Sequence, residues 1–120
     1  MVNDETVQYL ASTAVIAGVL GMRDKALSIS DALVATMPDS VDANLIAASA
    51  KLTAGRKQES IKILREKVLA VEPDRTLAKA MLSMAHDMMN EFSERDRLVD
   101  EVIEAGDDEN AIELVKGITS

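Results

Sequence analysis

Single glycines and prolines recur at one interval along this chain, and their spacing constrains the fold more than any other feature. Gly21 and Gly55 are 34 residues apart, and Pro38 and Pro73 are 35 residues apart. Each glycine precedes an amphipathic run, and each run ends at a proline followed by aspartate. Glycine commonly ends a helix, and proline disfavours helical geometry in the residue before it. The spacing therefore predicts a repeated unit of two helices.

Apolar residues recur at intervals of three and four along almost the whole chain, and no segment alternates strictly as a half-buried strand would. An all-α fold is therefore predicted. The chain has seven methionines but only one tyrosine and one phenylalanine, so its core must be built mainly from Ala, Leu, Ile, Val and Met. The expected helices cover about 4–20, 23–37, 40–54, 57–71, 75–90 and 92–105, with a short last helix at about 108–118.

The 120 residues are enough for one domain, predicted to span 1–120. Short connections between helices favour antiparallel packing of neighbours. Expected capping residues are Asp39 or Ser40 for the third helix, Asp74 for the fifth, and Asp107 or Asp108 for the last. The predicted repeat-like units are about 4–38, 40–73 and 74–105, followed by the terminal helix at 108–118.

The spacing of these glycines and prolines resembles that of the tetratricopeptide repeat, a hairpin of two helices repeated about every 34 residues. That family favours a small residue within the first helix, a glycine at its end, an alanine five residues later and a proline closing the second helix. The matching residues are Ala14, Gly21, Ala26 and Pro38 in the first unit, and Ala48, Gly55, Ser60 and Pro73 in the second.

The match is incomplete, because Ser60 replaces an alanine and the large aromatic residues of the family pattern are absent. In the third unit Asn90 stands near the glycine position and Glu94 at the alanine position, and no proline follows. The resemblance implies antiparallel hairpins in a short tetratricopeptide-like superhelical array with a C-terminal capping helix. A plain antiparallel helical bundle is the alternative.

Several function classes are disfavoured by composition. A net charge of −8 opposes binding to a phosphate backbone, so nucleic acid is not expected as a partner. The first ten residues carry two acids and no Lys or Arg, and no apolar run nears membrane-spanning length. We therefore expect a soluble, intracellular protein that does not bind membranes.

Catalytic and metal-binding motifs are also missing. With no cysteine and one histidine, the chain offers little to activate a nucleophile, and its five glycines form no phosphate-binding loop. Ser83 stands three residues before His86, where a helical metal site would need a carboxylate. His86 is expected to face solvent or the edge of a groove. The protein is thus predicted not to be an enzyme and to need no metal, cofactor or small-molecule substrate.

The first and fifth predicted helices carry apolar residues on two adjoining faces, more than one core-facing stripe requires. One face can pack within the array while the other is left for a partner. Alternatively, the surplus belongs to the core or is covered by the C-terminal helix. The methionines at 81, 84, 88 and 89 suit an adaptable groove for an amphipathic helix. In tetratricopeptide proteins the first helix of each repeat lines the concave side, which gives as groove candidates Ala11, Val15, Leu45, Leu52, Leu82 and Met89.

In size, acidity, alanine content and repeat pattern, the chain resembles the tetratricopeptide-like co-chaperones of bacterial type III secretion systems, which serve bacterial virulence. The similarity runs through "YLASTAVIAGVLGMRDKAL", "MPDSVDANLIAASAKLTAGRKQESIKIL" and "PDRTLAKAMLSMAHDMMNEF". It implies a cytoplasmic chaperone that, with a second small chaperone, sequesters the C-terminal helix of the needle subunit and prevents premature polymerisation. The alternatives are a generic tetratricopeptide adaptor, a chaperone of another secreted subunit, and a homo-oligomeric structural protein.

Overall fold

The structure is a computed structural model that describes residues 23–119, so the helix expected at 4–20 lies outside the described residues. The described part of the chain contains helices and connections but no strand, which confirms the all-α prediction. The helices are α2 (Arg23–Thr36), α3 (Val41–Thr53), α4 (Lys57–Ile63), a π-helical segment η1 (Leu64–Leu69), α5 (Thr76–Met88), α6 (Phe92–Ala105) and α7 (Glu109–Thr119).

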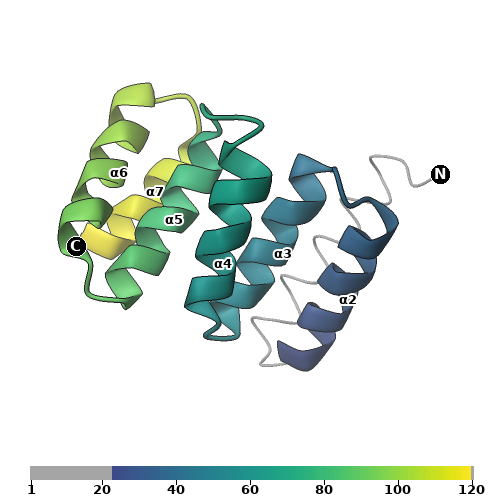
Figure 1. The fold of residues 1–120 in the computed structure, drawn as a ribbon. Helices are drawn as coiled ribbons and strands as arrows, with labels where there is room; N and C mark the ends of the chain where they lie inside the picture. The colour runs from purple at the N-terminus through teal and green to yellow at the C-terminus, as the bar shows by residue number, and fades with distance from the viewer. Residues whose placement is uncertain (1–22, 120) are drawn as a thin grey trace.

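Helices α2 to α6 lie side by side in chain order (Figure 1), and each packs against the next. The last helix, α7, turns back and packs on α5 as well as on α6. Helix α5 therefore has neighbours on several sides, including η1 and α4. This arrangement makes α5 the central helix of the C-terminal half.

Local signals set most helix ends where the sequence predicts them. The Ser40 hydroxyl accepts a hydrogen bond from the Ala43 N–H at 3.1 Å, and the Asp108 carboxylate accepts one from the Ala111 N–H at 3.0 Å. Gly55, with φ of +82°, follows α3, and Asn90, with φ of +61°, follows α5. Asn90 thus takes the left-handed conformation of the glycine whose position it occupies in the repeat pattern.

The prediction that Asp74 caps the fifth helix is wrong. Arg75 occupies the N-cap position of α5, and no side chain caps that helix. The guanidinium of Arg75 binds Asp42 at 2.8 Å and Glu72 at 3.2 Å. These ion pairs hold Arg75 at the start of α5 and leave Asp74 in the preceding turn.

The expected regular helix at 57–71 changes to a π-helix over its second half. The Ala70 N–H donates to the Arg65 carbonyl at 3.1 Å, a five-residue step. A π turn holds more residues than an α turn, so residues after it are rotated away from the α-helical stripe. Val71, which continues the apolar spacing of Leu64 and Val68 in the sequence, lies in the turn after this helix and is 64% exposed.

The core joins α3, η1, α5 and α6 around the fully buried Leu64 and Val68. A second cluster, including Ala80, Val102 and Val115, packs α5, α6 and α7 against one another. Alanines on α3 and α5 allow close helix packing. The buried Ser60 hydroxyl donates to the Ala48 carbonyl at 2.7 Å, which explains how a serine fits the position where the repeat pattern favours alanine.

Candidate functional site

An apolar hollow lies where α3, α5 and α7 meet, and we call it the methionine groove. It encloses about 370 Å³. Met81, Met84 and Met88 follow one another along α5 toward its C-terminal end, because three- and four-residue steps keep side chains on one helix face. The groove is lined by Ser49, Leu52, Thr53, Met81, Met84, Met88 and Leu114.

The two apolar faces of α5 have different neighbours. Ala78 and Leu82 lie in the core beside Leu64, whereas Met84 is partly exposed and Met88 is 40% exposed. Helix α7 covers α5 near Ala80 and contributes Leu114 to the groove wall. The C-terminal helix thus covers part of the surplus apolar surface and leaves part of it open.

The four predicted groove residues within 23–119 fall in three places. Leu52 lines the methionine groove, and Met89 lies in an adjoining pocket. Leu45 and Leu82 belong to the buried core and line neither hollow. The remaining two candidates, Ala11 and Val15, lie outside the described residues.

The groove also contains residues that the sequence analysis missed. Ser49 and Thr53 are polar, so an apolar stripe does not mark them, although they flank Leu52 at three- and one-residue steps on α3. Leu114 comes from a helix that is distant in sequence. Only the packing of α7 on α5 brings Leu114 to the site.

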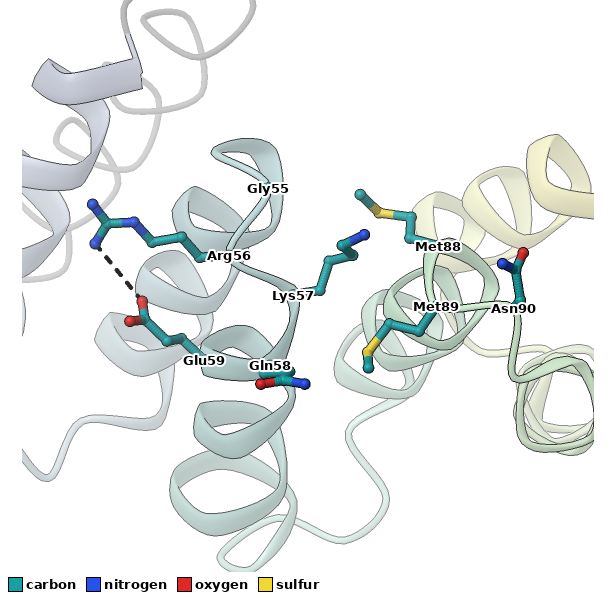
Figure 2. A pocket seen from close by; sticks show the side chains of 8 residues that line it. All are labelled: Gly55, Arg56, Lys57, Gln58, Glu59, Met88, Met89 and Asn90. Atoms are coloured by element: carbon teal, nitrogen blue, oxygen red, sulfur yellow. Dashed lines mark ion pairs between the residues drawn. The ribbon is translucent and has the colours of Figure 1, made fainter.

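The adjoining pocket, which we call the polar pocket, encloses about 590 Å³ and shares Met88 with the methionine groove (Figure 2). Lys57, at the start of α4, extends toward Met88 and Met89. Arg56 turns the other way and pairs with Glu59 at 3.7 Å. The other residues that line the polar pocket are Gly55, Gln58 and Asn90.

A buried hydrogen-bonded group lies next to Met84 and Met88 in sequence. His86 is 3% exposed, so the expectation of a solvent-facing or groove-edge histidine is wrong. The Arg65 guanidinium donates to His86 Nε2 at 3.1 Å, and because a guanidinium can only donate, the imidazole proton is assigned to Nδ1. Nδ1 then donates to the Glu91 carboxylate at 3.1 Å. His86 is buried here because both ring nitrogens have partners.

The turn between α5 and α6 is held by Arg95. Its guanidinium binds the Asp87 carboxylate at 2.8 Å and lies 4.6 Å from the centroid of the Phe92 ring. Hydrogen bonds from Arg95 to Asp87 and Asp96 raise the pKa of Arg95. The arginine therefore stays charged and ties α6 to the end of α5, where the methionine groove meets the polar pocket.

The described residues do not place three or more His, Cys, Asp or Glu side chains together as a metal site would require. None of the helices within residues 23–119 is both long and apolar enough to cross a bilayer. What the site offers is an apolar hollow of flexible side chains that adjoins a polar pocket carrying a lysine. Such a surface suits binding of an amphipathic segment.

Comparison with known proteins agrees with the type III secretion link predicted from sequence. A family described as bacterial type III secretion protein (HrpB1_HrpK) has a model that matches residues 1–120. No curated protein gives a significant match. Because the family match covers every residue, the chain belongs to the HrpB1_HrpK family of bacterial type III secretion proteins.

Proposed function

We propose that this type III secretion protein is a chaperone that holds an amphipathic helix of the needle subunit in its methionine groove. The single observation that carries the proposal is the partly open row of Met84 and Met88 facing Leu52 and Leu114. Unbranched methionine side chains adapt to the shape of an inserted helix. The proposal assigns the chain no catalytic chemistry, metal or cofactor.

The needle subunit is proposed because membership of a type III secretion family agrees with the co-chaperone resemblance of the sequence. A subunit that polymerises through an amphipathic helix stays soluble while the apolar face of that helix is covered. In this proposal the chaperone acts in the cytoplasm before secretion, together with a second small chaperone. The helical hairpins would form a tetratricopeptide-like array whose concave side includes α3 and α5.

Co-expression with the needle subunit of the same secretion system tests the proposal. We expect a soluble complex that contains the subunit and that fails to form when the C-terminal helix of the subunit is deleted. The groove needs apolar anchors spaced at three, four and seven residues on that helix. Equal recovery of the full-length and truncated subunits would contradict the proposed mechanism.

The competing functions give different results in the same experiment. A homo-oligomeric structural protein would associate with itself at micromolar concentration and would not retain the needle subunit. A generic adaptor would bind another helix-bearing protein and leave the needle subunit insoluble. Light scattering of the purified chain, with and without the subunit, separates these outcomes.

A further inference from the structure

Lys57 stands out among the residues beside the methionine groove. It is partly buried, points toward Met88 and Met89, and forms no ion pair with any residue in the described part of the chain. The nearby carboxylate of Glu59 does not pair with Lys57, because it lies within 3.7 Å of Arg56 and 3.5 Å of Lys51. The lysine is therefore a cation available to a ligand.

Two side-chain amides accompany this lysine. Gln58 and Asn90 both line the polar pocket, and neither side chain has a hydrogen-bond partner among residues 23–119. Arg56, Lys57 and Glu59 leave one positive charge in excess in the pocket of a protein whose net charge is −8. The polar pocket thus offers N–H donors and positive charge at the end of an apolar groove.

Only the C-terminal end of a bound helix would be stabilised by N–H donors and positive charge. The last four carbonyl groups of a helix lack partners within the helix, and its C-terminal end carries partial negative charge. A terminal carboxylate adds a full negative charge there. The N-terminal end instead presents N–H groups and positive charge, which Lys57 would repel.

We propose that the groove sets the direction of the bound helix, with the C-terminal carboxylate of the partner in the polar pocket next to Lys57. This inference rests on the proposed function. The helix would run from Met84 toward Met88, in the same direction as α5, because the polar pocket adjoins the groove at Met88. Gln58 and Asn90 would donate to the last carbonyl groups of the helix.

The test uses the full chain and a synthetic peptide with the sequence of the needle subunit's C-terminal helix, made either as the free acid or as the C-terminal amide. Amidation removes the terminal charge and leaves the apolar face unchanged. We expect the free acid to bind about fivefold more tightly at low ionic strength. The difference in affinity between the two peptides should decrease as salt is added, because the pocket is open to solvent.

The variant Lys57→Gln should remove the difference between the acid and the amide, whereas Lys62→Gln should preserve it. Lys62 is an exposed lysine of the same helix that does not line the polar pocket. Thermal melts of both variants check that each remains folded. If the acid and the amide still differ as much in affinity for Lys57→Gln, Lys57 does not bind the C-terminal carboxylate.

Cross-linking gives the direction independently of affinity. Because the chain has no cysteine, single variants Gln58→Cys and Ser49→Cys can each be joined by a short bismaleimide to a peptide with one cysteine. We expect Gln58→Cys to couple to a cysteine near the peptide's C-terminus in preference to one near its N-terminus. The reverse preference would overturn the inference.

The outcomes separate this inference from the proposed function. Equal affinity of acid and amide for the unaltered protein would overturn the direction and leave the chaperone proposal standing. Absence of binding by both peptides would overturn the proposed function and the inference with it.

Discussion

The guanidinium of Arg65 lies 3.1 Å from Nε2 of His86 and joins the π-helical segment to the buried side of α5. Glu91 completes the group by accepting from His86 Nδ1 at 3.1 Å. Met84 and Met88 stand two residues to either side of His86, on the helix whose position this contact fixes. The buried polar group therefore supports the floor of the methionine groove without lining it.

Replacing His86 by alanine is expected to destabilise the fold by about 2 kcal/mol. The change creates a cavity and leaves Arg65 and Glu91 without their partner. Urea unfolding followed by circular dichroism measures the effect. Arg97→Ala, which removes an exposed residue paired only on the surface, should change the free energy of unfolding by less than about 0.5 kcal/mol. Equal midpoints for the two variants would contradict a supporting role for His86.

Ser60 should tolerate a smaller residue but not a larger one. Ser60→Ala removes the hydrogen bond to the Ala48 carbonyl and should cost about 1 kcal/mol. Ser60→Leu should cost about 3 kcal/mol or more, because the fully buried site between α3 and α4 has no room for a large side chain. Thermal melts compare the two with Ser93→Ala at an exposed position. A stable Ser60→Leu protein would contradict close packing of this hairpin.

Glu94 provides a pH test of an ion pair in α6. A hydrogen bond from Arg97 at 3.0 Å lowers the pKa of Glu94 below its ordinary value of 4.5. A lowered carboxyl pKa means that the pair stabilises the fold above about pH 4.5 and that this contribution is lost as pH falls through the folded-state pKa. A carbon-detected NMR titration should show this lowered pKa.

The matched variants for this titration are Arg97→Gln and Lys25→Gln. The first should raise the pKa of Glu94 toward its ordinary value, and the second should leave it unchanged because Lys25 is an exposed residue of α2. A pKa of Glu94 that does not respond to Arg97→Gln would show that another interaction sets it.

The helices could be predicted because their signals are local. Ser40 and Gly55 act within a few residues of the helix ends that they set, and both were identified from sequence. The π-helical turn at 64–69 was not predicted, because its residues also suit an α-helix. Arg65 within it contacts His86, which is 21 residues away in the chain, and periodicity does not reveal such a contact.

The division between core and groove was only partly predictable. Helix α5 is apolar on two faces, and periodicity alone does not say which face a neighbour covers. Leu82 lies in the core because α5 packs on η1 at this face. Met84 and Met88 line the groove because α7 covers only part of α5. The methionines were recognised as groove residues by their chemistry, whereas Leu45 and Leu82 were assigned to the groove by analogy with repeat position.

Charge substitutions separate these two kinds of residue. Leu82→Glu should unfold the protein, because it places an unpaired carboxylate in the core. Met88→Glu should leave the fold intact, because the Met88 side chain already contacts solvent. Circular dichroism and a thermal melt distinguish the results. A folded Leu82→Glu protein would contradict the observed core.

Binding of the full-length needle subunit by the Met84→Glu variant tests whether the methionine groove holds the partner helix. Met84 lines the methionine groove, so a carboxylate there would oppose the apolar face of the bound helix. We expect a loss of at least about tenfold in affinity, with helicity unchanged. The matched control is Ile103→Glu, which alters an apolar residue that is 54% exposed on α6 and lines neither hollow. We expect only Met84→Glu to weaken binding, and equal affinities for the two folded variants would contradict binding in the methionine groove.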